Sequence, residues 1–131
     1  MPIKSWVHVP FVPLIIPGGW IVHRNNFSAV EPIVENGVFV NSSLFDEDLL
    51  WIERLVPEDR TWPKWSLDMG WYAAPSGNID GNYRLELVLD NWETILKTYT
   101  TRDYKEMQSM INHWLRILTM HPFDESGIPL L

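Results

Sequence analysis

Residues 65–73 read WSLDMGWYA, and this stretch decides the fold. Its apolar side chains fall on every second position, from Trp65 to Ala73. Successive side chains of a strand point to opposite faces, so the spacing predicts a strand with one face in a core. The same alternation returns at residues 83–89. It predicts inward side chains at Tyr83, Leu85, Leu87 and Leu89, with Arg84, Glu86, Val88 and Asp90 facing water.

Two reversals join these segments to a third strand. Residues 75–82 are dense in Pro, Ser, Gly, Asn and Asp, which favour turns. Asp90-Asn91 predicts the next reversal, and the β-branched and aromatic residues from Trp92 to Thr100 predict another strand. The sequence therefore predicts a three-strand antiparallel meander over residues 65–100.

The first forty residues add shorter elements. Residues 6–22 are strongly apolar, but Pro10, Pro13 and Pro17 interrupt them. Neither a signal peptide nor a membrane-spanning helix tolerates such breaks, so we expect an extended segment over the core. It gives way at Gly18-Gly19 to a strand at 20–24. Asn36-Gly37 predicts a hairpin turn, with a short strand at 38–40.

Residues 43–56 fit two structures. Ser43 and Asp46 have the spacing of a capping box, which favours a helix start. Leu49 to Val56 can instead form a strand that ends at Pro57. Both alternatives remain open, and we favour the strand.

One long helix is expected at residues 104–119. Asp103 and Glu106 offer an N-terminal cap, and Pro122 stops the helix. Its apolar stripe consists of Tyr104, Met107, Ile111, Trp114, Leu115 and Leu118. The predicted fold class is therefore α+β, an antiparallel meander sheet with one amphipathic C-terminal helix packed on one face. The 131 residues are expected to form a single domain.

The net charge of −7 is confined to one quarter of the chain. Residues 31–59 hold eight acidic residues and a single base, Arg54, so the rest of the chain is neutral. Such a field repels nucleic acid and anionic membranes and attracts basic proteins. It equally fits a solvated face that serves solubility. The candidate partner-binding residues are Phe45, Asp46, Glu47, Asp48, Trp51, Glu53, Glu58 and Asp59, with the two aromatics as anchors or as core residues.

No catalytic signature or metal-ligand spacing is evident. The four histidines lack paired spacing, and three consecutive acids at 46–48 do not converge on one point in a strand or a helix. We therefore expect no cofactor, no metal and no enzymatic activity. The absence of Cys excludes a disulfide framework and fits the cytoplasm. Two other classes stay open, a small enzyme that uses Asp68, Glu86 or His23, and an adaptor module that binds proteins.

Several segments together resemble small bacterial immunity proteins of contact-dependent inhibition and related polymorphic toxin systems. The segments are 19–22, 25–27, 45–50, 68–72, 81–85, 90–93 and 113–115. The resemblance implies a cytoplasmic protein that binds and neutralises a cognate toxin domain. Such toxins are often nucleases with basic surfaces, which an acidic inhibitor would complement. The oligomeric state does not follow from the sequence.

Overall fold

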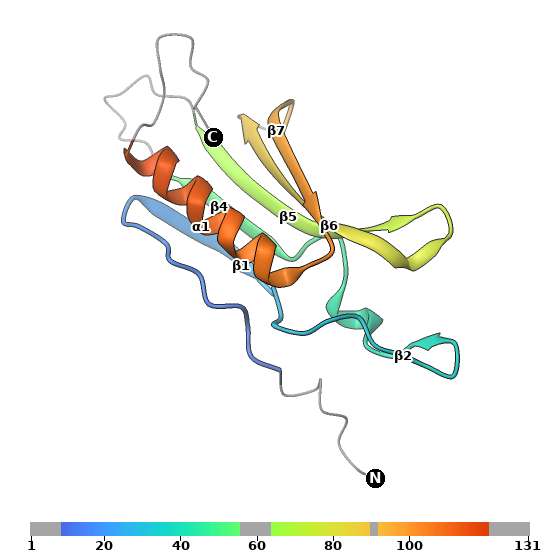
Figure 1. The fold of residues 1–131 in the computed structure, drawn as a ribbon. Helices are drawn as coiled ribbons and strands as arrows, with labels where there is room; N and C mark the ends of the chain where they lie inside the picture. The colour runs from blue at the N-terminus through green and yellow to red at the C-terminus, as the bar shows by residue number, and fades with distance from the viewer. Residues whose placement is uncertain (1–8, 56–63, 90–91, 121–131) are drawn as a thin grey trace.

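The computed structural model describes residues 9–55, 64–89 and 92–120 (Figure 1). Five antiparallel strands form one sheet in the order β1-β4-β5-β6-β7. Their bounds are β1 Trp20–Asn25, β4 Leu50–Arg54, β5 Trp65–Ala74, β6 Gly77–Leu89 and β7 Thr94–Thr101. One helix, α1, spans Tyr104–Met120 and lies across one face of the sheet. The predicted α+β class and the meander β5-β6-β7 are confirmed.

The predicted core face of the meander is confirmed. Trp65, Leu67, Met69, Trp71, Tyr83, Leu85 and Leu87 are each at most 2% exposed. Leu89 is half-buried and packs against this core. Three expectations were wrong. Glu86, expected to face water, is 8% exposed. Ala73 is exposed, because β5 runs past the core into a projecting hairpin. Val88 is buried on the opposite face of the sheet.

The turn between β5 and β6 is shorter than residues 75–82. Ala74 pairs with Gly77, so Pro75 and Ser76 alone make the reversal. Gly77 has a φ of 139°, a left-handed backbone that only glycine adopts easily. Two cross-strand contacts keep the following polar residues in β6. The Trp71 indole donates to the Asn78 carbonyl at 2.8 Å, and the Arg102 guanidinium donates to the Gly81 carbonyl at 2.6 Å.

The third strand starts at Thr94 rather than at Trp92. Trp92 has a φ of 68°, which places it in the turn and outside the β region. The Asn36-Gly37 hairpin is confirmed, with β2 Val34–Glu35 paired to β3 Val38–Phe39. Both turn residues have positive φ, as a type I′ turn requires.

Residues 42–54 contain both a short helix and the favoured strand. The 3-10 helix η2 covers Ser42–Leu44, one residue before the expected start at Ser43. The predicted capping box does not form, because Asp46 lies beyond this helix and accepts the Asp48 N–H instead. The strand β4 follows at Leu50–Arg54.

The helix α1 is capped and anchored at both ends. The Asp103 carboxylate accepts the Lys105 N–H at 2.8 Å, as expected of a cap. Glu106 does not return to the Asp103 N–H, and accepts instead from the Thr101 hydroxyl. At the other end, Arg54 donates to the Leu118 carbonyl at 2.7 Å, and the Trp20 indole donates to Thr119.

The residues preceding β1 form the expected extended segment. Ile15 donates to the Asn112 side chain, and the Pro13 carbonyl accepts from Gln108, so this segment lies along α1 (Figure 1). Val12 is buried in the core. In the described part of the chain, no helix is long and apolar enough to cross a membrane.

Candidate protein-binding face

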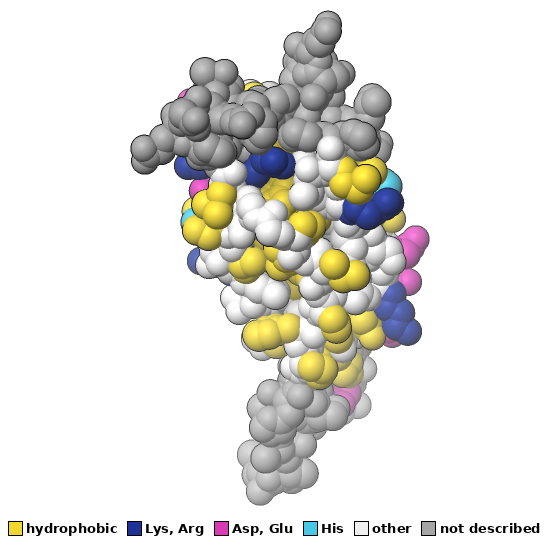
Figure 2. All heavy atoms as spheres, turned by 90° about the vertical axis from the view of Figure 1, so that its left-hand side faces the viewer, with side chains coloured by type: hydrophobic (Ala, Val, Ile, Leu, Met, Phe, Trp, Pro, Cys, Tyr) yellow, Lys and Arg dark blue, Asp and Glu magenta, His cyan; other side chains and the backbone are white. Residues whose placement is uncertain are grey.

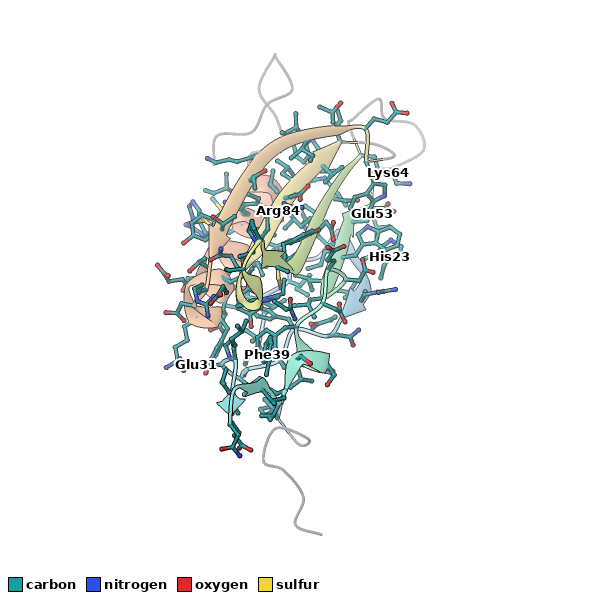
Figure 3. All side chains as sticks on the ribbon, turned by 90° about the vertical axis from the view of Figure 1, so that its right-hand side faces the viewer. His23, Glu31, Phe39, Glu53, Lys64 and Arg84 are labelled. Atoms are coloured by element: carbon teal, nitrogen blue, oxygen red, sulfur yellow. The ribbon has the colours of Figure 1, made fainter. Side chains whose placement is uncertain are left out.

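The sheet has a second face, opposite α1, on which polar and aromatic side chains gather. The register places Trp51 beside Asp68 and Asp68 beside Glu86, on three adjacent strands. Figure 3 views this face, and no described helix lies in front of the sheet there. We call it the open face. Its polar and aromatic side chains include those of His23, Arg24, Trp51, Glu53, Ser66, Asp68, Arg84 and Glu86, with Lys64 and Trp92 at its border, and Ile21 and Val88 lie on the same face.

An aromatic row crosses one end of the open face. The His23 ring stacks on Trp51 with centroids 4.1 Å apart, and Trp51 meets Trp92 edge-on at 5.5 Å. The Trp51 indole N–H points to the Ser66 hydroxyl at 3.4 Å. Ser66 is buried beneath this contact. Trp92 itself remains 44% exposed, so an aromatic surface faces solvent here.

Two carboxylates occupy the centre of the open face. Glu86 is nearly buried and pairs with Arg84, with Nε and Oε1 2.7 Å apart. The Arg84 guanidinium also lies over the Tyr72 ring at 3.6 Å. Burial, together with the charges of Glu86 and Asp48, raises the pKa of Asp68 to about 6. Within the described residues, no donor forms a hydrogen bond to the Asp68 carboxylate.

The acidic loop, residues 46–48, adjoins these carboxylates. Trp71 donates its N–H to the Asp46 carbonyl and Leu49 donates to the Met69 carbonyl, so the loop follows β5. Gly70 makes this approach possible, because a Cβ at that position would collide with the Glu47 backbone. Asp46, Glu47 and Asp48 are all exposed, and Asp48 lies 3.7 Å from Arg24. The acidic loop therefore continues the open face.

The structure separates the predicted partner-binding residues into three groups. Asp46, Glu47, Asp48, Trp51 and Glu53 are accessible at or beside the open face. Glu53 is half-buried and lies 3.5 Å from both His23 and Lys64. Of the two roles left open for Phe45, anchor or core residue, the anchor role is wrong. It is 3% exposed and packs edge-on against Trp71 at 5.0 Å, as a core residue. Glu58 and Asp59 lie outside the described residues.

The sequence did not predict three residues of the open face as partner-binding candidates. Asp68 and Glu86 were considered only for catalysis, although strict alternation already placed both on one face. Trp92 was assigned to a strand, and nothing in the local sequence signals its positive φ. Together with the acidic loop, these residues give a surface that is richer in carboxylates than in bases and bordered by indole rings.

This surface can bind a cation but offers no evident metal centre. Among the described residues, no group of three or more His, Asp or Glu side chains is placed to hold a metal ion. A guanidinium or ammonium group is better suited, because it can pair with a half-buried carboxylate and lie against an aromatic face.

Comparisons with known proteins add no family. A scan against protein-family models and searches of curated proteins and of solved structures found no match to this chain.

Proposed function

We propose that this chain is an immunity protein, which binds the basic surface of a cognate toxin domain through the open face and the acidic loop. The observation that carries the proposal is the half-buried Asp68 carboxylate. Burial and the charges of Glu86 and Asp48 disfavour its ionised form more than the charges of Arg84 and Arg24 favour it, and no described residue donates a hydrogen bond to it. An ionised carboxylate in such a place is unfavourable until a cation reaches it. A partner that supplies this cation gains a charge-assisted hydrogen bond.

The aromatic row supports the same proposal. Interfaces are anchored by Trp, Tyr and Arg side chains, and indole faces attract guanidinium groups. Trp51 and Trp92 lie at the border of the carboxylates, so one arginine or lysine of the partner can contact both features. The exposed acidic loop then contributes mainly to the rate of encounter.

The finer identification rests on the resemblance to immunity proteins. A nuclease toxin carries a basic surface for its nucleic acid substrate, and an acidic inhibitor covers such a surface by charge complementarity. Such an inhibitor acts in the cytoplasm, where the toxin meets its substrate.

Protection of cells against the toxin tests the proposal. The toxin domain encoded beside this gene is expressed together with the wild-type chain or with a variant, and growth is followed. We expect wild-type protection, and its loss in Glu47→Lys with Asp48→Lys. Both residues are exposed, and Asp46 is left in place because its carboxylate accepts the Asp48 N–H.

The matched control is Glu31→Lys with Glu35→Lys, which reverses the same number of charges elsewhere. Glu31 lies on the opposite side of the view from Glu53 and His23 (Figure 3). Loss of protection in both double variants would point to overall charge and contradict a defined face. The absence of a toxin reading frame beside the gene would contradict the immunity assignment itself.

One observation favours a second candidate function, acid–base catalysis. Asp68 and Glu86 are cross-strand neighbours, and a carboxyl group with a pKa of about 6 is suited to proton transfer. Glu86 is, however, already paired with Arg84. A turnover that Asp68→Asn abolishes while binding of the toxin domain persists would favour catalysis over binding.

A further inference from the structure

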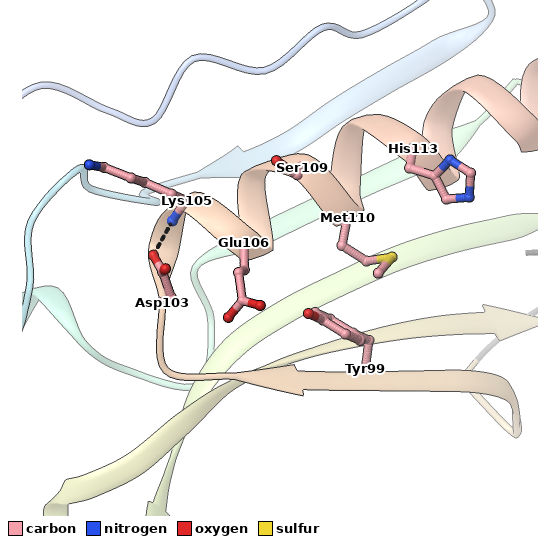
Figure 4. A pocket seen from close by; sticks show the side chains of 7 residues that line it. All are labelled: Tyr99, Asp103, Lys105, Glu106, Ser109, Met110 and His113. Atoms are coloured by element: carbon pink, nitrogen blue, oxygen red, sulfur yellow. Dashed lines mark hydrogen bonds between the residues drawn. The ribbon is translucent and has the colours of Figure 1, made fainter.

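A groove separates α1 from the edge strand β7, on the side of the sheet away from the open face (Figure 4). Its volume is about 480 Å³. Tyr99 comes from β7 and Asp103 precedes the helix, while five lining residues come from two turns of α1. These are Lys105, Glu106, Ser109, Met110 and His113.

The strand beside this groove has an unpaired edge. In the described part of the chain β7 pairs with β6 alone, so its other edge presents backbone N–H and C=O groups. The first half of β7 is poorly suited to a further strand, because its register shifts beside Leu96 and Lys97 follows. The second half, Thr98–Thr101, keeps a regular register with β6 and carries no charged side chain.

The groove and the regular half of β7 coincide. Tyr99 lies at the centre of this half and faces α1, where it is half-buried against the core together with Met110 (Figure 4). Glu106 lies beside Tyr99 at one end of the groove, where its carboxylate accepts from the Thr101 hydroxyl at 2.7 Å. An added strand would therefore meet backbone groups along β7, an apolar floor, and a carboxylate.

Charged side chains near the groove bear on which ligand fits it. The view onto α1 and the N-terminal segment shows apolar side chains spread between charged ones of both signs (Figure 2). Asp103 and Glu106 lie at one end of the groove, and Figure 4 shows the Lys105 side chain directed away from Tyr99 and Met110. A basic residue in the ligand fits this end of the groove by charge complementarity.

We propose that the groove binds an extended peptide segment of a partner protein, which adds to Thr98–Thr101 as a sixth strand. Its inward side chain is apolar and packs on Tyr99 and Met110, and a neighbouring Lys or Arg lies beside Glu106. Backbone hydrogen bonds supply affinity, and the two side chains supply specificity, as in other recognition by strand addition.

A display library of random heptapeptides, selected on the full chain, is the probe. We expect the selected peptides to alternate β-branched or aromatic residues with polar ones and to contain Lys or Arg. Ser109→Trp should weaken their binding about tenfold or more, because the new indole fills the groove at an exposed position of α1. Trp92→Ala, on the open face, should leave it unchanged.

Two further readouts identify strand addition itself. Methylation of two alternate backbone nitrogens of the selected peptide should abolish binding, and bound peptide should slow amide exchange at Thr98–Thr101. An empty selection, or binding that survives both Ser109→Trp and backbone methylation, would overturn the proposal. The proposal would also fail if sedimentation showed a dimer and the amides of Thr98–Thr101 were already protected from exchange without peptide. The edge of β7 would then be occupied by a second copy of this chain.

Discussion

Asp68, which we propose as a group that binds a partner's cation, carries a cost to the stability of the fold. Its pKa is raised to about 6 in the fold, against about 3.9 in an unfolded chain. The ionised form is therefore disfavoured by folding, and stability is lost as pH rises from 4 through 6. Asp68→Asn removes this penalty. After allowance for solvent screening, the variant should be about 1–2 kcal/mol more stable at pH 7.

Urea unfolding of both proteins at pH 4 and pH 7 measures this effect. The gain should be small at pH 4, where Asp68 is protonated in the fold and about half protonated in the unfolded chain, and complete at pH 7. A variant that is less stable than wild type at pH 7 would show that the carboxylate has a stabilising partner.

Gly70 is the residue that lets the acidic loop pack against β5. A Cβ at this position meets the Glu47 backbone, which cannot move without displacing the acidic loop. Gly70→Ala should cost about 1–3 kcal/mol, the usual range for overpacking. Gly18→Ala is the control, because a Cβ there meets nothing within 4 Å. Equal denaturation midpoints for the two variants would contradict the packing of the loop on β5.

At the scale of elements, α1 depends on Arg54 for its position. The guanidinium donates to the Leu118 carbonyl and lies about 6 Å from the rings of Trp20 and Trp65. Arg54→Met keeps much of the apolar stem but removes the donor, and should cost about 1–3 kcal/mol. Arg116→Met, on the exposed side of α1, should stay within about 0.5 kcal/mol. Thermal unfolding of the pair measures the difference.

The elements were largely predictable because their signals are local. Alternation from Trp65 to Trp71 and the apolar stripe of α1 depend on spacing alone, and Asn36-Gly37 on turn chemistry. Contacts across the sheet carry no such signal. Phe45 and Trp51 look alike in sequence, yet η2 directs Phe45 into the core while the register of β4 leaves Trp51 on the open face. The proximity of Asp48 to Asp68 likewise depends on how β4 aligns with β5.

The whole molecule combines two unlike faces. One face of the sheet is filled by α1 and carries the core, and the other gathers carboxylates and indoles beside the acidic loop. Four of the eight acids in residues 31–59, namely Asp46, Glu47, Asp48 and Glu53, lie at or beside this surface. That asymmetry is the basis of the central claim, that the open face binds a basic protein.

The most direct test is the association rate of the toxin domain with wild type, with Glu47→Lys/Asp48→Lys and with the control Glu31→Lys/Glu35→Lys, at low and moderate salt. The account predicts that the first double variant associates about tenfold more slowly at low salt, with a weaker salt dependence, while the control stays close to wild type. An unchanged rate and salt dependence in Glu47→Lys/Asp48→Lys would contradict the account and leave the acidic loop as a solvated surface.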